Sequence, residues 1–228
     1  MRIGVLFSGG KDSTYSLHWA HARGLLVKCL ITVEPPSSES WMFHYPNVRL
    51  TKLQSLALKI PQVYELCRDI KEESEVEALK KAIAKAIDLY DIEALVTGAL
   101  LSDYQRMTIE MLCEELNLPV LSPLWRRNQE DYLFELLDLG IEFVITSITV
   151  MGLSPKLLGK VITREDVEEI VSCSRKYRFN AAFEGGEAET LVVDSPLFIK
   201  RLRVRGRIMR EGQYSWRYII SEAELVEK

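Results

Sequence analysis

The feature that most constrains this chain is a glycine-containing loop directly after its first apolar segment. Residues 8–13 read Ser-Gly-Gly-Lys-Asp-Ser and follow the apolar residues 3–7. When a buried strand runs through such a turn into a helix, backbone N–H groups and the positive helix end face one concavity, which favours phosphate. Gly9 and Gly10 permit positive φ angles and close approach of a ligand, and Lys11 adds a positive charge. We expect a phosphate site in an open surface cleft.

The loop differs from the Walker A pattern and resembles another phosphate loop. Val5 stands where Walker A needs its first glycine, and Asp12 follows Lys11 where it needs serine or threonine. The hexamer instead resembles the PP-loop of the ATP pyrophosphatases, which cleave ATP between the α- and β-phosphates. The resemblance implies that ATP or its pyrophosphate is bound by Ser8, Gly9, Gly10, Lys11, Asp12, Ser13 and Gly98. The alternative is a capped glycine turn without a ligand.

Composition narrows the possible functions. The formal net charge is −4, so no general basic field recruits nucleic acid, and we expect no direct nucleic-acid binding. No apolar run approaches the roughly 18 residues that span a bilayer, and no leader precedes the first strand, so we expect a cytoplasmic protein without membrane contact. The four cysteines form no CxxC pair, which argues against sulfur transfer.

The pattern of apolar segments predicts an α/β fold with a doubly wound parallel sheet. Strand and helix signals alternate, and in such a sheet ligands bind at the carboxyl ends of the strands. The loops 8–13, 34–47 and 98–103 are all expected at that edge. The predicted strands are 2–7, 27–33, 62–66, 94–97, 119–121 and 143–150, and the predicted helices are 12–23, 51–59, 71–90, 103–116 and 129–139.

The character of the sequence changes after Gly152. A short helix over 164–174 precedes strand-like segments at 191–194, 199–209 and 213–220. We therefore expect a nucleotide-binding domain over residues 1–150 and a smaller C-terminal α+β region over 151–228 that binds substrate.

Three further segments carry candidate site residues. In residues 98–106, a helix cap explains Ser102 and Asp103 but leaves Tyr104, Gln105 and Arg106 without a reason. The aromatic run 41–45, which includes His44, suggests a substrate contact or a lid, or else a loop folded onto an apolar surface. Residues 184–190 place three carboxylates around a Gly-Gly pair, which suits either a bound cation or a solvated turn.

Taken in order, these motifs resemble the diphthine–ammonia ligase family in its short, archaeal form. The matching segments are 8–13, 40–47, Gly98 with 102–106, 123–125 with Gln129, 152–153 with 158–159, and 184–190 with 194–198. The resemblance implies a HUP-like PP-loop domain and an ATP-dependent amide ligase. Such an enzyme adenylates the carboxylate of diphthine on translation elongation factor 2, amidates it with ammonium, and releases AMP and pyrophosphate.

The resemblance also implies roles for particular residues. Lys11 and Asp12 would be catalytic, and Asp12 is the candidate ligand of a Mg²⁺ ion. Substrate contacts are implied for His44, Ser102, Asp103, Tyr104, Gln105, Arg106, Glu184, Gly185, Gly186, Glu187, Glu189 and Thr190. We further hypothesise that residues 184–190 fold back to the strand edge that carries 8–13. Ala188 departs from the aromatic residue that the family often has there.

Two alternatives to the ligase stay open on the sequence. One is another PP-loop enzyme that adenylates a tRNA base, and the other is a nucleotide-binding regulator without catalysis. The sequence leaves the oligomeric state open, including a homo-oligomer.

Overall fold

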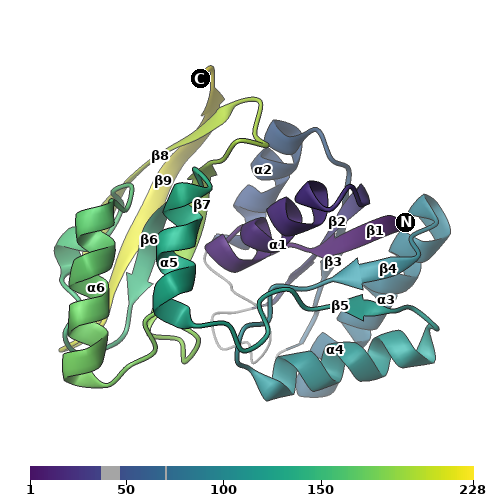
Figure 1. Ribbon diagram of the computed structural model, residues 1–228, viewed down its shortest axis with the longest axis horizontal. Helices are drawn as coiled ribbons and strands as arrows, with labels where there is room; N and C mark the ends of the chain where they lie inside the picture. The colour runs from purple at the N-terminus through teal and green to yellow at the C-terminus, as the bar shows by residue number, and fades with distance from the viewer. Residues whose placement is uncertain (37–46, 70) are drawn as a thin grey trace. The chain divides into compact units, whose positions relative to one another are not determined.

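The computed structural model describes residues 1–36, 47–69 and 71–228 and divides the chain into two compact units (Figure 1). The first unit is Met1–Trp125 and the second is Arg126–Lys228. Each unit has its own sheet: the first sheet has the strand order β3-β2-β1-β4-β5, and the second has the order β7-β6-β9-β8. The predicted α/β fold with a parallel sheet is confirmed for the first unit.

Every strand pair of the first sheet is parallel. β1 lies between β2 and β4, so the chain leaves β1 in one direction and returns to β4 on its other side. This is the topological switch point, where ligands bind at the carboxyl ends of the strands. The elements are β1 (Arg2–Leu6), α1 (Lys11–Ala22), β2 (Leu26–Glu34), a short 3-10 helix (Val48–Leu50), α2 (Thr51–Leu58), β3 (Gln62–Leu66), α3 (Glu72–Tyr90), β4 (Ala94–Val96), α4 (Asp103–Glu115) and β5 (Val120–Leu121).

Apolar spacing along α3 and α4 explains how these helices pack. Leu79 and Ile83 of α3 are fully buried, and Ile109 and Leu112 of α4 join them in one cluster with Leu95 of β4. These positions recur every three or four residues, which places them on one side of each helix. On the described part of the chain, no helix is long and apolar enough to cross a membrane.

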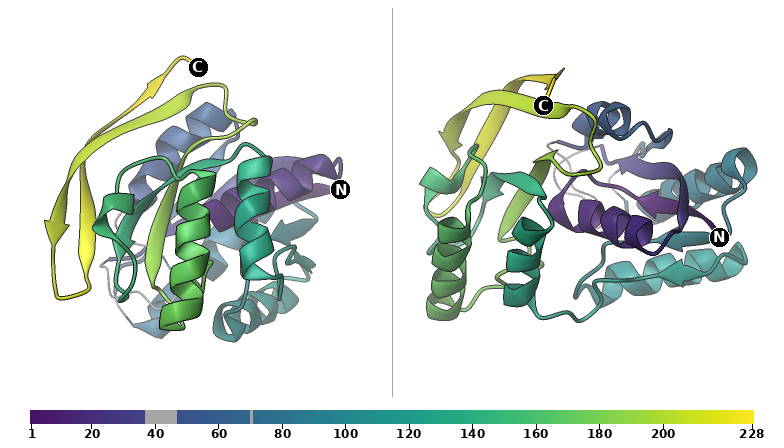
Figure 2. Two further views of the ribbon diagram at one scale, coloured as in Figure 1. Left: turned by 60° about the vertical axis from the view of Figure 1, so that its left-hand side comes forward. Right: turned by 45° about the horizontal axis from the view of Figure 1, so that its top comes forward.

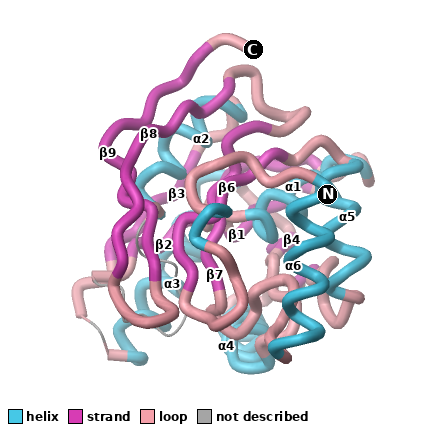
Figure 3. Tube along the Cα trace, turned by 90° about the vertical axis from the view of Figure 1, so that its left-hand side faces the viewer, coloured by secondary structure: helices cyan, strands magenta, loops and turns pink. Residues whose placement is uncertain are grey.

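The second unit is an antiparallel sheet with two helices, α5 and α6, which lie side by side (Figure 2). β8 and β9 form a long hairpin (Figure 3). The last two residues of β6 pair with the first two residues of β9. The elements are α5 (Gln129–Asp138), β6 (Glu142–Ile148), a short 3-10 helix (Pro155–Leu157), α6 (Arg164–Tyr177), β7 (Ala188–Asp194), β8 (Arg201–Arg210) and β9 (Trp216–Val226).

The structure places the division between the units earlier than the expected boundary at residue 150. The predicted strand over 143–150 exists as β6, but it pairs antiparallel with β7 and β9 and not with the parallel sheet. β6 is almost entirely buried. A strand buried on both faces looks in sequence like a strand of a parallel sheet, so its apolar pattern does not reveal its partners.

Candidate active site

The phosphate loop connects β1 to α1 at the switch point of the first sheet. Gly9 has a φ of +80°, as its glycine predicts, whereas Gly10 has a φ of −83° and is the N-cap of α1. The conformational freedom of glycine is therefore used at Gly9 and not at Gly10. Gly10 supplies no side-chain cap, and the first N–H groups of a helix have no acceptor within the helix. The loop thus presents a helix N-terminus, whose partial positive charge favours an anion.

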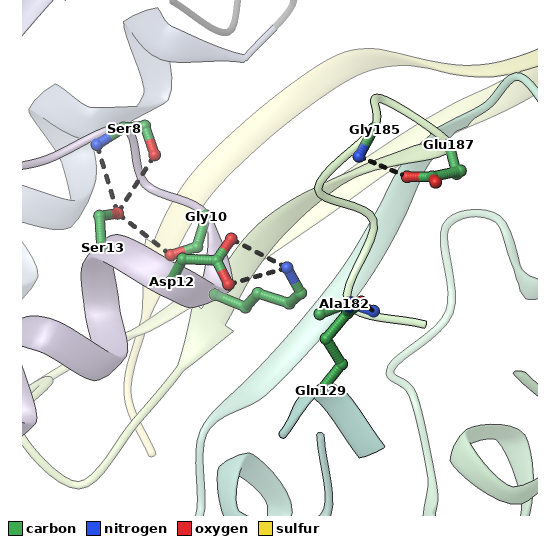
Figure 4. A network of polar contacts seen from close by, with 9 residues as sticks. Ser8, Gly10, Asp12, Ser13, Gln129, Ala182, Gly185 and Glu187 are labelled. Atoms are coloured by element: carbon green, nitrogen blue, oxygen red, sulfur yellow. Dashed lines mark hydrogen bonds and ion pairs between the residues drawn. The ribbon is translucent and has the colours of Figure 1, made fainter. Parts of the chain in front are cut away.

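Two serines close the loop. The Ser13 hydroxyl accepts a hydrogen bond from the Ser8 N–H at 3.3 Å and donates to the Gly10 carbonyl at 3.2 Å (Figure 4). The hydroxyls of Ser8 and Ser13 lie 3.2 Å apart. These contacts hold the two ends of the turn together, which explains serine at both ends of the motif.

Lys11 is buried, contrary to the expectation of an open cleft. It is 2% exposed, and its Nζ lies 2.8 Å from both carboxylate oxygens of Asp12 (Figure 4). The Asp12 side chain keeps 25% of its surface exposed. A buried ammonium needs a counter-charge, since removing it from water is costly. Asp12 provides that charge here, and phosphate oxygens are the other kind of group that could meet Lys11.

Gly98 lies beside the loop because β4 neighbours β1. A Cβ atom at residue 98 would come within 2.9 Å of the Asp12 carbonyl carbon and 3.0 Å of the Ser13 nitrogen. The preceding residue, Thr97, accepts a hydrogen bond from Ser16 of α1 through its carbonyl. Gly98 therefore makes room for the backbone of the first turn of α1. This contact explains the glycine without a ligand, and a role of Gly98 in ATP binding stays a prediction.

The segment that follows β4 begins α4, and its side chains make contacts within the first unit. Ser102 caps the helix by accepting the Gln105 N–H at 3.3 Å. Arg106 pairs with Glu110 at 2.6 Å and stacks over Trp125. The Tyr104 hydroxyl donates to Glu72 at 2.7 Å. Burial and this carboxylate raise the pKa of Tyr104 to about 12. The cap is confirmed, whereas substrate contacts by Ser102, Asp103, Tyr104, Gln105 and Arg106 stay predictions.

A buried carboxylate at the end of β2 is a feature that the sequence analysis missed. Glu34 is 6% exposed, and it accepts hydrogen bonds from the Tyr64 hydroxyl at 2.6 Å and from Arg49 at 2.5 Å. Burial raises the pKa of Glu34, but the hydrogen bonds from Tyr64 and Arg49 and the nearby positive charges outweigh burial and lower it below its usual value. The position of Glu34, directly before Pro35-Pro36, is the only signal in the sequence.

In the second unit, the acidic segment is a turn organised around Glu187. This carboxylate is 9% exposed and accepts three N–H groups. Two come from Asn180, from its backbone at 2.8 Å and its side-chain amide at 2.9 Å. The third is the Gly185 backbone N–H at 2.8 Å (Figure 4). Gln129 at the start of α5 accepts the Ala182 N–H at 2.9 Å and donates to the Asn180 side chain at 3.2 Å. We call Gln129, Asn180, Gly185 and Glu187 the turn network.

The contacts of Glu187 bear on one of the two alternatives from the sequence. A solvated turn would leave the carboxylate exposed, whereas three protein N–H groups meet it here. Contacts of Glu184, Gly185, Gly186, Glu187, Glu189 and Thr190 with a cation or a substrate stay predictions. Glu184, Glu189 and Thr190 are half-buried, and Gly186 adopts a φ of +80°. The approach of residues 184–190 to the phosphate loop stays a prediction. The substrate contact expected of His44 lies outside the described residues.

The cysteines are spread over both units. All four are unpaired thiols, and Cys29 and Cys113 are buried, as predicted. Burial raises the pKa of each of these two thiols to about 12. A thiol with so high a pKa is a poor nucleophile at neutral pH, because the thiolate is the reactive form.

Two family models match the chain in tandem. The diphthamide synthase N-terminal domain matches residues 1–120, and the diphthamide synthase C-terminal domain matches residues 128–225. The gap between the two matches contains the division that the structure makes after Trp125.

Curated relatives with one name align over most of the chain. The human protein named diphthine–ammonia ligase is 34% identical over 226 residues, which is 90% of this chain and 83% of the relative. The zebrafish protein of that name is 30% identical over 89% of this chain and 86% of its own length. The fission yeast protein, also so named, is 32% identical over 89% of this chain but only 36% of its own length.

Among solved structures, one described as a "predicted subunit of tRNA methyltransferase" from Methanocaldococcus jannaschii aligns with 86% of this chain and 98% of its own. The TM-score is 0.43 and the sequence identity is 20%. This likeness is too low to bear on function.

Proposed function

The chain belongs to the diphthamide synthase family, and we propose that it is an ATP-dependent amide ligase that joins ammonia to the carboxylate of diphthine. The observation that carries the proposal is the tandem match of both family domains over residues 1–120 and 128–225. The phosphate loop supports it independently, since a strand–turn–helix anion site at the switch point suits a nucleotide.

The chemistry requires an activated carboxylate, because ammonia does not displace oxide or hydroxide from a carboxylate ion. In the first step, a carboxylate oxygen of diphthine attacks the α-phosphorus of ATP, and the bond between the α-phosphorus and the bridging oxygen to the β-phosphorus breaks. Pyrophosphate leaves and carries the electron pair. In the second step, ammonia attacks the acyl carbon, AMP leaves with the electron pair of the broken C–O bond, and the nitrogen loses a proton to form the amide.

The loop residues suit the first step. Negative charge grows on the departing pyrophosphate, and N–H donors and positive charges already in place lower the energy of that transition state. The N-terminus of α1 and Lys11 are such groups in this chain. Lys11 would exchange its contact with Asp12 for a phosphate oxygen.

The loop 8–13 offers a Mg²⁺ ion one carboxylate ligand, Asp12. The described residues contain no group of three or more His, Cys, Asp or Glu side chains that could hold a metal. Mg²⁺ in nucleotide sites is often held by the phosphates and one or two carboxylates, and Asp12 is a partly exposed carboxylate in the loop. When bound there, Mg²⁺ would offset negative charge on the phosphates.

The macromolecular substrate is inferred from the family. Diphthine is a modified histidine of translation elongation factor 2, so that factor is the proposed partner, together with ATP and ammonium. A cytoplasmic location follows as part of this proposal, because translation takes place there.

The proposal is tested by incubating the chain with diphthine-bearing elongation factor, ATP and ¹⁵N-ammonium. Intact mass of the factor should show the replacement of a hydroxyl by an amino group, and chromatography should show AMP and pyrophosphate in equal amounts. ADP with orthophosphate as the main products would contradict the PP-loop assignment. A parallel reaction with total tRNA addresses the alternative, and labelled nitrogen or AMP formed only with tRNA would overturn the ligase proposal.

A further inference from the structure

Two buried side chains donate hydrogen bonds to backbone carbonyls at the start of the phosphate loop. The Thr32 hydroxyl of β2 donates to the Phe7 carbonyl at 2.6 Å, and the Gln54 amide of α2 donates to the Gly9 carbonyl at 2.9 Å. Thr32 is 2% exposed and Gln54 is fully buried. Neither residue belongs to the motif 8–13, and both lie on the side of the loop that faces away from water.

A third side chain fixes the direction of these hydrogen bonds. The Gln62 amide nitrogen of β3 donates to the hydroxyls of Thr32 and Thr51, each at 2.8 Å. A hydroxyl has one hydrogen to donate, so Thr32, which already accepts from Gln62, directs its hydrogen to the Phe7 carbonyl. In the same way Thr51 donates to the Val48 carbonyl. Gln62 therefore links the loop to the segment that begins α2.

The glycine at residue 9 is needed for the contact with Gln54. A Cβ atom there would lie 2.3 Å from the Gln54 Oε1 and 3.1 Å from the Thr51 Cγ2. The positive φ of Gly9 would strain any other residue as well. The side chain of Gln54 thus occupies the space beside Gly9, and the loop depends on α2 for its shape.

The hydrogen bond to the Gly9 carbonyl determines where the next N–H points. In a trans peptide group the C=O and N–H bonds point in opposite directions, and the described chain has no cis peptide. Because the Gly9 carbonyl faces Gln54, the Gly10 N–H faces away from α2. Gly10 is the N-cap of α1, so its N–H points out at the helix N-terminus where an anion binds.

We propose that Gln54 is a positioning residue for phosphate binding: it holds the Gly9–Gly10 peptide so that the Gly10 N–H faces the phosphate groups of the nucleotide. Thr32 does the same for the Phe7–Ser8 peptide, whose N–H meets Ser13. The proposal rests on the proposed function, since it assumes that this loop binds the phosphates of ATP. It extends the nucleotide site to a helix and a strand that contribute no residue to the motif.

The test compares three variants of the full chain by calorimetric titration with inorganic pyrophosphate and with ATP. Gln54→Met keeps the length of the side chain but cannot donate. Gln54→Glu keeps the shape and donates to the Gly9 carbonyl only when its carboxyl is protonated. The matched control is Ser55→Ala, which removes a side-chain hydrogen bond of the same helix, from Ser55 to the Ile60 carbonyl at 2.6 Å. Thermal unfolding of each variant accompanies the titrations.

We expect Gln54→Met to weaken pyrophosphate binding tenfold or more and to lower kcat of the ligation, whereas Ser55→Ala binds like the wild type. For Gln54→Glu we expect affinity that falls relative to the wild type at the same pH as the pH rises and the carboxyl ionises, whereas the ratio of Gln54→Met to the wild type stays constant over that pH range. A folded Gln54→Met variant that binds pyrophosphate within threefold of the wild type overturns the proposal. If Gln54→Met does not fold, a Gln54→Glu variant without that pH dependence overturns it as well.

The two proposals fail separately. A wild-type chain that binds pyrophosphate but forms no amide refutes the ligase and leaves the role of Gln54 to be decided by the titrations. A wild-type chain that forms the amide, together with a Gln54→Met variant of normal affinity, refutes the role of Gln54 alone. A wild-type chain that binds neither pyrophosphate nor ATP overturns the positioning proposal.

Discussion

Replacing Glu187 by glutamine distinguishes an internal role of this carboxylate from a role in binding a cation. In the structure the Glu187 carboxylate accepts three N–H groups and is 9% exposed. The substituted side chain would keep one oxygen for the two N–H groups of Asn180. Its amide nitrogen would then face the Gly185 N–H, donor against donor. We therefore expect Glu187→Gln to destabilise the turn between Asn180 and residue 187.

The expected loss follows from the three contacts. A hydrogen bond to a charged group contributes about 1.5–3 kcal/mol, and one such bond is lost outright. The two bonds from Asn180 become neutral and so weaker. Together these changes predict a fall of about 2–4 kcal/mol in the free energy of unfolding. If Glu187 instead bound a cationic substrate, the free energy of unfolding would hardly change and the KM for ammonium or diphthine would rise.

Urea denaturation of the full chain measures this difference. The matched control is Glu222→Gln, the same substitution at a carboxylate whose side chain is 67% exposed and lies 3.8 Å from Arg205. Exposed pairs contribute little, so the control should stay within about 0.5 kcal/mol of the wild type. If Glu187→Gln is as stable as this control, the turn network does not depend on the charge and our reasoning is refuted. A raised KM for ammonium in that stable variant would favour the cation site.

Three further outcomes are expected. Lys11→Met should lower the rate of pyrophosphate release about 10²–10³-fold, as the loss of one pre-organised donor does. Urea denaturation should show little change, because the Asp12 side chain is 25% exposed and water can solvate its carboxylate. A rate within threefold of the wild type would exclude Lys11 from catalysis. Gly98→Ala should lower the free energy of unfolding by about 1–3 kcal/mol in urea denaturation and weaken ATP binding in titrations, because its Cβ would lie 2.9 Å from the Asp12 carbonyl carbon. Unchanged stability and affinity would contradict this packing. Tyr64→Phe should reduce the free energy of unfolding by about 1.5–3 kcal/mol at pH 7 and by less at pH 3. The pKa of Glu34 is lowered in the folded state, so its ionised form stabilises the fold above the pKa of the unfolded chain, and this stabilisation is lost as the pH falls through the pKa of the folded state. Equal losses at both pH values in urea denaturation would contradict this reasoning.

The parts of the fold that depend on local sequence could be predicted. The strand–loop–helix over residues 2–22 follows from an apolar run, a glycine turn and a helix with its C′ glycine at Gly24, whose φ is +69°. The cap at Ser102 follows from the side chain alone. These features are set within a few residues, so their sequence signals are specific.

The parts that depend on distant partners could not be predicted. β6 finds its neighbours in strands that begin at Ala188 and Trp216, and its own residues are apolar in either kind of sheet. The inward orientation of Glu187 depends on the Asn180 side chain and on the backbone around it. In the sequence, three carboxylates beside two glycines have the same appearance whether they face water, a ligand or the backbone.

Gly9 and Gly98 show why a motif can be recognised correctly and its residues still be misread. The sequence suggests that each glycine makes room for a ligand, yet the atoms that would meet a Cβ belong to Gln54 in one case and to the first turn of α1 in the other. Gln54 beside Gly9 and Gly98 beside the first turn of α1 both pack against the loop inside the protein. A loop held in this way keeps its N–H groups in place before the nucleotide arrives, so binding requires less reorganisation. The glycines therefore serve phosphate binding through the shape of the loop, and Gln54 is the side chain through which that dependence can be measured.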